Sequence, residues 1–335
     1  MSRAFESFLP AALEAVATAA EITRRVQANV HVIGEHTKDD RSPVTVADYA
    51  AQAIVSLVLE GAGLSTSDRL IVGEEDAAAL RTPEQELVRA AVVATVSAWR
   101  PGLDEDAILA AIDCCDHDGS ATSYWTLDPV DGTKGFLRGQ QYAIALARIE
   151  HGQVVLGVLG CPNLPINIEM PPTEADPAGV GSLYAAMCGA GAWEYPDADP
   201  QADPLRINCP TWSPEMPVRC CASVEKAHSN RSDTDQLLEH LGARTEPVRL
   251  DSQAKYAVLA RGQADAYLRM PTRPDYVERI WDHAAGSLLA TEAGAMVTDI
   301  TGAPLDFTCG AGLDRNRGVI AAAAGLHPKL IEGIH

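Results

Sequence analysis

The chain has 335 residues, of which 47% are hydrophobic and 21% are charged, and its 26 Lys and Arg against 46 Asp and Glu give a net charge of −20. This composition is that of an ordinary globular protein and excludes a disordered or collagen-like chain, while the length is typical of two domains. No apolar stretch reaches the roughly 18 residues that a membrane helix needs, and an acidic surface repels a phosphate polymer. We therefore expect neither a membrane nor a nucleic-acid polymer as a partner.

The first 200 residues predict helices and hairpins in separate groups. Residues 45–60 give the clearest helix, because their apolar side chains recur at i, i+3, i+4 and i+7, with Thr45 as a candidate N-cap. Two apolar runs joined by His151 and Gly152 predict a hairpin. The other expected elements are helices over 4–30 and 84–99, a strand over 70–72, an acidic loop with a short helix over 100–123, hairpin strands over 142–150 and 153–159, a Pro-rich loop over 162–181, and a second hairpin over 182–187 and 192–195. This segregation indicates an α+β domain.

Strands and helices alternate in the second part of the chain, after a segment at 195–204 that is rich in Pro and Asp. Alternation of this kind predicts a layered α/β domain. We place the domains at 1–200 and 201–335. The expected strands are 218–223, 247–250, 264–269 and 295–300, and the expected helices are 232–241, 252–261 and 283–293.

The first motif that could carry chemistry lies at residues 125–136, with the sequence WTLDPVDGTKGF. We expect a strand that ends at Asp128 and a turn fixed by Pro129. In such a turn the carboxylates of Asp128 and Asp131 can face one point together with the Val130 carbonyl. A set of oxygen ligands of this kind suits Mg²⁺.

Two residues that follow this turn extend the same hypothesis. Gly132 permits an unusual backbone angle, and Thr133 would begin a helix whose free amides can hold a phosphate oxygen. The alternative is that the whole segment is a β-turn followed by a helix cap, since Asp and Gly are common in turns.

Three further acids are candidates that are weak when taken singly. Glu74 follows a predicted strand, where a carboxylate is well placed for a site, although a solvated acidic loop is the alternative. Asp282 would open the helix over 283–293, and an N-cap role alone would also explain it. Asp48 would lie in the first turn of its helix, where a capping box with Thr45 is the alternative.

The eight cysteines indicate a reducing compartment. No C-x-x-C spacing occurs, and several of the cysteines lie in apolar contexts, as small buried hydrophobic residues do. Because the N-terminus also lacks the pattern of a signal peptide, we expect a cytoplasmic protein, or an organellar one if a presequence was removed. Cys114 and Cys115 are expected in an exposed acidic loop, and a redox role for them is left open.

Taken together, six segments resemble the 3′(2′),5′-bisphosphate nucleotidase family, within the lithium-sensitive, Mg²⁺-dependent phosphatase superfamily that includes inositol monophosphatase. These segments cover nearly the whole chain in the order that the family shows, and they are 42–48, 73–75, 125–137, 251–256, 267–269 and 281–286. The Asp-Ser-Gln-Ala-Lys block that begins at Asp251 and the segment 135–139 look specific to nucleotidases. The fold implied is a layered αβαβα arrangement, with the metal site between an α+β N-terminal domain and an α/β C-terminal domain.

The resemblance implies two to three Mg²⁺ ions per site, most of whose ligands come from the N-terminal domain. The first ion would be held by Glu74, Asp128 and the Val130 carbonyl, the second by Asp128, Asp131 and Asp282, and a third, more loosely, by Asp48 and Glu74. It also implies that Asp48 and Thr133 activate the attacking water. The substrate-binding residues implied are Gly132, Thr133, His228, Ser252, Lys255, Arg269 and Asp282.

The implied activity is hydrolysis of the 3′-phosphate of adenosine 3′,5′-bisphosphate to AMP and phosphate, with 3′-phosphoadenylyl sulfate as a second candidate substrate and a link to sulfur metabolism. The partner would be a small nucleotide bisphosphate, and we expect a monomer. An inositol polyphosphate 1-phosphatase is the alternative within the same chemistry, and the Asp251–Lys255 block argues for a nucleotide. A non-catalytic metal- or nucleotide-binding sensor is the alternative from another class, and it would be expected to lack one of Asp48, Asp131 or Thr133.

Overall fold

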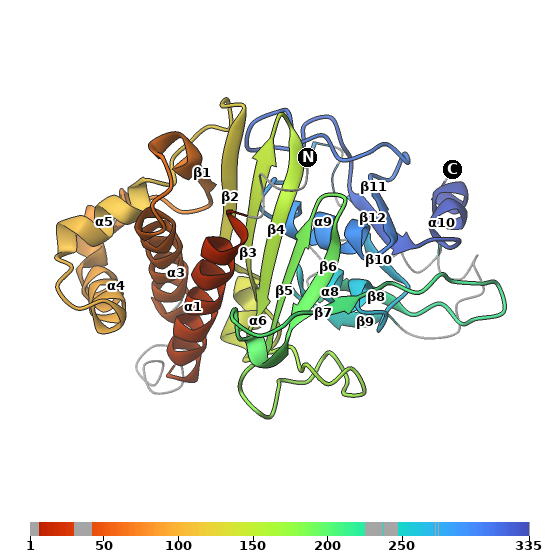
Figure 1. The fold of residues 1–335 in the computed structure, drawn as a ribbon, viewed down its shortest axis with the longest axis horizontal. Helices are drawn as coiled ribbons and strands as arrows, with labels where there is room; N and C mark the ends of the chain where they lie inside the picture. Colours follow the sequence, from red (N-terminus) through yellow and green to blue (C-terminus); the bar gives the residue numbers. More distant parts are fainter. Residues whose placement is uncertain are drawn as a thin grey trace.

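The protein folds into alternating layers of helix and sheet in a computed structural model that describes residues 7–29, 42–224, 237, 247–271, 273 and 275–334. Figure 1 shows helices α1 and α3 against one face of a large sheet, helices α8 and α9 on its other face, then a smaller sheet and finally α10. This is the layered αβαβα arrangement expected from the resemblance, so the predicted fold class is confirmed. The division of the chain into domains at residue 200 stays a prediction.

The large sheet has seven strands in chain order, β1 to β7. Strand β1 is parallel to β2, and every other neighbouring pair is antiparallel. The strands are β1 Ile71–Gly73, β2 Ser123–Asp131, β3 Ala143–Glu150, β4 Gln153–Cys161, β5 Ser182–Met187, β6 Gly191–Tyr195 and β7 Leu205–Ile207. The hairpin of β3 and β4 is confirmed, and its two turn residues have the positive φ angles, 50° at His151 and 74° at Gly152, that a tight two-residue turn needs.

Helices α1 Leu9–Ala28 and α3 Ser42–Gly61 pack on the outer face of the large sheet, and α4 Glu86–Trp99 and α5 Glu105–Asp113 pack on α3. Their buried side chains form one cluster with the side chains on that face of the sheet. The expectation that no apolar stretch reaches the length of a membrane helix is wrong for α3, because its Pro43–Gly61 part is long and apolar enough to cross a bilayer. This part is 78% buried within the fold, as in the central helix of a protein core. Helices α1 and α4 confirm, within a few residues, the helices predicted over 4–30 and 84–99.

The predicted N-cap at Thr45 is wrong, because α3 already includes Ser42. Pro43 is compatible with this early start, since the first helical turn needs no N–H from it. Asp48 therefore lies beyond the first turn, so a capping role no longer explains it. It is buried instead, with 7% of its surface exposed.

The small sheet has the order β11-β12-β10-β8-β9, with parallel pairs on the β8 side and antiparallel pairs on the β12 side. Its strands are β8 Cys220–Ser223, β9 Val248–Leu250, β10 Ala266–Arg269, β11 Ala295–Thr298 and β12 Val319–Ala323, and the helices around it are α8 Ala254–Ala260, α9 Ala284–Glu292 and α10 His327–Ile334. The strands β7 and β12 and the helix α10 were not predicted. Three consecutive alanines end β12, and alanine favours a helix, so the pairing of β12 with β10 and β11 overrides its local preference.

Of three further expectations, one lies outside the described residues and two are wrong in part. The helix expected over 232–241 lies outside the described residues, apart from position 237. Helix α9 has His283 at its N-cap position without a capping side-chain bond, so Asp282 is not a cap. All eight cysteines, each of which the structure describes, are free thiols; Cys114 is exposed at the end of α5, whereas Cys115 is buried rather than in an exposed loop.

Candidate active site

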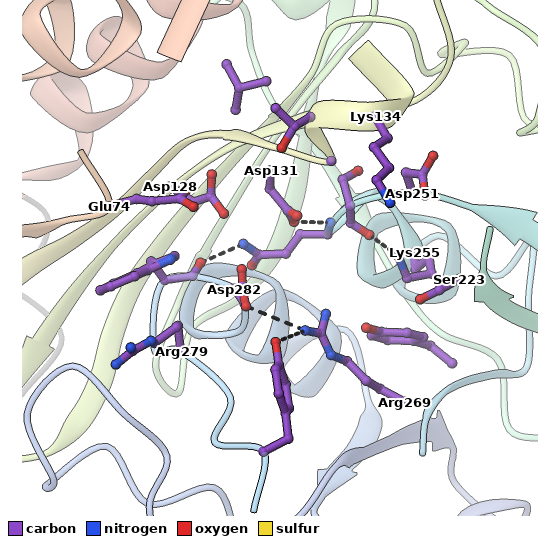
Figure 2. Close-up of a pocket in the computed structure, with 18 residues that line it drawn as sticks. Glu74, Asp128, Asp131, Lys134, Ser223, Asp251, Lys255, Arg269, Arg279 and Asp282 are labelled. Carbon is purple, nitrogen blue, oxygen red and sulfur yellow. Dashed lines mark hydrogen bonds and ion pairs between the residues drawn. The ribbon is translucent and has the colours of Figure 1, made fainter. Parts of the chain in front are cut away.

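A cavity of about 350 Å³ lies where β2 and α6 Thr133–Leu137 face the elements of the small sheet, and residues from both parts of the chain line it. Figure 2 shows it with the acids Glu74, Asp128 and Asp131 beside the cations Lys255 and Arg269. The sequence-predicted residues that line the cavity are Glu74, Asp128, Val130, Asp131, Gly132, Thr133, Ser252, Lys255, Arg269 and Asp282. His228 lies outside the described residues.

Strand register brings Glu74 and Asp128 together. Strands β1 and β2 are parallel, and Gly73 pairs with Leu127, so Glu74 and Asp128 follow at the same level of the sheet. The carboxyl ends of adjacent parallel strands are a common place for a binding site. The sequence motif predicted each acid, and this pairing explains why they share one site.

The segment from Asp128 to Asp131 is a β-bulge and not the predicted turn. Strand β2 continues through it, with Asp128 paired to Ala145 and Asp131 paired to Ala143, so that two residues on β2 oppose one on β3. Residues three apart on a regular strand point to opposite faces, and the extra residue returns both aspartates to one face. A proline is tolerated at such a bulge because it need not donate to the ladder.

The aspartates meet a third carboxylate from the other part of the chain. Asp128, Asp131 and Asp282 each offer an oxygen, and these oxygens lie within 4.8 Å of one another. Asp128 Oδ1 is buried and has no hydrogen-bond partner among the described residues. Because a buried charged oxygen without a partner is costly, these residues fit a bound cation with oxygen ligands.

Burial and mutual repulsion raise the pKa values of these acids. Burial raises the pKa of Glu74 to about 8, with further increases from Asp282 and Glu75. Burial and Asp282 raise the pKa of Asp131 to about 7, and burial together with Glu74 and Asp131 raises that of Asp128 well above its usual value. Like charges at this spacing cannot all ionise without compensation, which a divalent metal ion would supply.

Asp48 lies close enough to this cluster to interact with the charges of Glu74 and Asp128. It is not among the described residues that line the cavity, but burial and the charges of Glu75 and Glu74 raise its pKa. Gln52, one turn further along α3, accepts from the Glu75 N–H at 3.2 Å and donates to the Glu75 carbonyl at 2.5 Å. This amide clamp holds the Glu74–Glu75 loop against the helix that carries Asp48.

Each residue of the Asp251–Gln253 segment contacts the chain at or just after the β-bulge of β2. Asp251 forms an ion pair with Arg138, at the end of α6. Gly132 has φ of 91°, and a Cβ there would lie 2.9 Å from the Cβ of Ser252, so a larger residue would strain both the backbone and this contact. The Gln253 N–H donates to the Asp131 carboxylate. Ser252 itself has φ of 69°, an uncommon angle for a residue with a side chain.

Lys255 is buried, with 2% of its surface exposed. Its Nζ donates to the carbonyls of Ser252 at 2.6 Å and Leu250 at 3.2 Å, and it lies 5.1 Å from the centre of the Tyr267 ring. Burial lowers its pKa to about 8, although Asp131 opposes this shift. A solvated surface position, the simpler explanation for a lysine on this helix, is therefore wrong.

Arg269 reaches the cavity from β10 and is paired on its other side. It forms two bonds with the Glu278 carboxylate and lies 3.6 Å from Asp282, measured from Nη2 to Oδ2. Burial opposes ionisation of Glu278, yet Arg269 and His283 bring its pKa down to about 2.

Several described residues at the site had no role in the sequence analysis. Gln253 stood inside a recognised block, which was its only signal, and its contact with Asp131 depends on the tertiary fold. Glu278, which does not line the cavity, stands in no motif, and only the structure shows that it binds Arg269. The cavity residues that had no role, besides Gln253, are Lys134, Ser223, Asp251, Tyr267, Tyr276, Arg279 and Trp281.

Comparisons with known proteins identify the family of this chain. Residues 5–335 match the model of the inositol monophosphatase family. A protein of Schizosaccharomyces pombe named 3′(2′),5′-bisphosphate nucleotidase is 40% identical over 98% of this chain and 95% of its own length. One of Oryza sativa with the same name is 42% identical, over 97% of this chain and 93% of its own length.

Solved structures show the same fold at low sequence identity. An inositol monophosphatase from Anabaena superposes with a TM-score of 0.59 at 18% identity, covering 98% of this chain and 95% of its own. CysQ from Bacteroides thetaiotaomicron, described as a bacterial member of the inositol monophosphatase family, gives 0.58 at 20% identity over 95% of this chain and 98% of its own. With a family match that spans almost the whole sequence, the chain belongs to the inositol monophosphatase family.

Proposed function

We propose that this protein is an Mg²⁺-dependent phosphomonoesterase that hydrolyses the 3′-phosphate of adenosine 3′,5′-bisphosphate, releasing AMP and phosphate. The observation that carries the proposal is the shared cavity, in which an acid cluster suited to a cation adjoins the buried cations Lys255 and Arg269. The family is one of metal-dependent phosphatases, and relatives about 40% identical along nearly the whole chain are named 3′(2′),5′-bisphosphate nucleotidase.

The metal would be held by the acids already described. In this proposal Glu74, Asp128, Asp131 and Asp282, with the Val130 carbonyl, hold two Mg²⁺ ions, and Asp48 with Glu74 holds a third more loosely. When bound, Mg²⁺ lowers the pKa of a water ligand and stabilises the charge on the phosphoryl oxygens.

The remaining residues would orient water and substrate. Helices α3 and α6 contact each other, which supports a shared role for Asp48 and Thr133 in holding the attacking water. The raised pKa of Asp48 makes its carboxylate a stronger proton acceptor. The phosphate that is not cleaved would bind Lys255 and Arg269, with Ser252 and Gly132 shaping the wall beside it.

A substrate panel tests this function. Phosphate release is measured with Mg²⁺ on adenosine 3′,5′-bisphosphate, 3′-phosphoadenylyl sulfate, inositol 1,4-bisphosphate and AMP. We expect the first substrate to give the highest kcat/KM, the sulfated nucleotide to be hydrolysed as well, and AMP to be inert. A preference for the inositol bisphosphate would make the protein an inositol polyphosphate phosphatase, and binding without turnover would make it a sensor.

Its compartment and assembly remain part of the proposal. Eight free thiols support a reducing compartment such as the cytoplasm. We propose a monomeric enzyme, which sedimentation of the purified protein would test.

A further inference from the structure

Glu278 is a buried acid behind the cavity wall. It lies in the segment between β10 and α9, and 3% of its surface is exposed. Its two oxygens bind the Arg269 guanidinium from one side: Nε donates to Oε1 at 2.8 Å, and Nη2 lies 2.6 Å from Oε2. This two-point geometry fixes the plane of the guanidinium as well as its position.

A second contact holds Glu278 itself. His283, which is fully buried, places Nε2 3.2 Å from Glu278 Oε2, and its Nδ1 lies 2.9 Å from the Tyr256 hydroxyl. Tyr256 lies on α8 and His283 at the start of α9, so the chain of contacts is anchored in two helices. Glu278, Asp282 and His283 also lie close enough to hold a metal ion, but Glu278 and His283 already have these protein partners. We therefore assign Glu278 and His283 to positioning.

Arg269 is the point at which this buried chain meets the cavity. Its Nη2 lies 3.5 Å from the Tyr276 hydroxyl and 3.6 Å from the Asp282 carboxylate, both of which line the cavity (Figure 2). A long side chain held on several sides has little rotational freedom to lose when an anion binds. An anion in the cavity therefore meets a guanidinium that is already oriented.

We propose that Glu278 is a positioning residue for substrate specificity. By fixing Arg269, it sets how well the site recognises the second phosphate of a nucleotide bisphosphate, the one that is not hydrolysed. This inference rests on the proposed function. It predicts that loss of the Glu278 charge weakens recognition of that phosphate without impairing the cleavage of the other one.

The variant Glu278→Gln tests the inference, because it keeps the size of the side chain and removes its charge. We expect KM for adenosine 3′,5′-bisphosphate to rise about 10- to 100-fold, the range for a lost hydrogen bond to a charged group. For adenosine 3′-monophosphate, which lacks the second phosphate, the loss in kcat/KM should be much smaller, because this substrate offers Arg269 no second phosphate to bind. Equal losses on both substrates would overturn the inference.

A control separates specificity from the general cost of removing a buried, paired carboxylate charge. Asp265, directly before β10, is also buried and binds the partly exposed Arg219, with Nη2 2.7 Å from Oδ1, and neither residue lines the cavity. Asp265→Asn should lower the melting temperature while KM on both substrates stays within about twofold, since no cavity contact changes. If Glu278→Gln does not fold, Glu278→Asp replaces it, because the shorter acid retains the charge but not the two-point contact.

Equilibrium binding distinguishes failure of this inference from failure of the proposed function. AMP carries the 5′-phosphate and adenosine does not, so calorimetry of both ligands measures recognition of that group without turnover. The wild type should bind AMP more tightly than adenosine, and Glu278→Gln should lose most of that difference. A second outcome is a wild type that hydrolyses no bisphosphate and still prefers AMP to adenosine, with that preference lost in Glu278→Gln. Such a result would support the inference about Glu278 and refute the proposed phosphatase function. A wild type that binds both ligands equally would contradict the inference.

Discussion

The backbone N–H of Gln253 donates a hydrogen bond to the carboxylate of Asp131, and so joins the segment before α8 to the bulge in β2. The side chain of the same residue continues the connection, because Nε2 donates to the Trp281 carbonyl at 2.8 Å and Oε1 accepts from the Gly286 N–H at 2.9 Å. Gln253 thus links Asp131, through its backbone, to residues on both sides of Asp282, through its side chain. One residue therefore connects two acids that come from opposite parts of the chain.

We predict that Gln253→Met destabilises the fold and weakens metal binding. The substitution leaves the Trp281 carbonyl and the Gly286 N–H without this partner, which should cost about 2–5 kcal/mol of the free energy of unfolding. Denaturant unfolding and Mg²⁺ titration measure the two effects. Gln263→Met is the control, because Gln263 also donates to two backbone carbonyls, those of Ile168 and Met170, away from the cavity. Unchanged Mg²⁺ affinity in Gln253→Met would refute the positioning role.

Removal of the metal should abolish activity. The Mg²⁺ concentration that restores activity should depend on pH. Because the pKa values of Glu74 and Asp131 are raised to about 8 and 7, these acids carry protons at neutral pH that Mg²⁺ must displace. The Mg²⁺ concentration for half-maximal activity should therefore fall as pH rises from 6 to 8.5. Full activity in excess chelator would refute the metal site. The remote variant Asp306→Asn should keep the same pH dependence.

The metal-free protein should lose stability as pH rises. A carboxyl whose pKa is raised in the folded state favours folding below its unfolded pKa, and this contribution is lost as pH rises through the folded pKa. For Glu74 that window runs from about 4.5 to about 8. Melting temperatures in chelator at pH 6 and 8 measure the decline, and saturating Mg²⁺ should reduce it.

Asp48→Asn should lower kcat by about 10²- to 10⁴-fold at saturating Mg²⁺, the range for loss of a general base. The variant keeps the size of the side chain, and helix capping is excluded because α3 begins before Asp48. Asp104→Asn is the control, since Asp104 caps α5 through the Ala107 N–H and asparagine caps equally well. A near-normal kcat in Asp48→Asn would remove Asp48 from the catalytic residues.

Lys255→Met should reduce kcat/KM for adenosine 3′,5′-bisphosphate by about 1.5–3 kcal/mol, the value of a hydrogen bond to a charged group. The effect on adenosine 3′-monophosphate should be small, since that substrate has no second phosphate. In the wild type the pKa of about 8 means that Lys255 loses its charge as pH rises. The kcat/KM ratio of bisphosphate to monophosphate should then fall above pH 8, and a flat ratio would contradict the assignment.

The sequence alone was sufficient for what depends on local chemistry. The hairpin at His151 and Gly152 follows from turn residues that adopt positive φ, and amphipathic spacing predicted α3 within a few residues. Contacts between near neighbours in sequence determine both features. The acids of the site each had a local alternative, and they were assigned to one site because six segments together resemble a known family.

Only the tertiary structure decided which of these residues meet and in what state. The bulge that turns Asp128 and Asp131 to one face depends on pairing with β3, and the hydrogen bond from Gln253 to Asp131 joins residues 122 positions apart. The alanine-rich β12 shows the same limit, because two neighbouring strands outweigh its preference for helix. The physical reason is that burial, charge pairing and strand register are properties of contacts between distant segments, and the order of residues along the chain does not contain those distances.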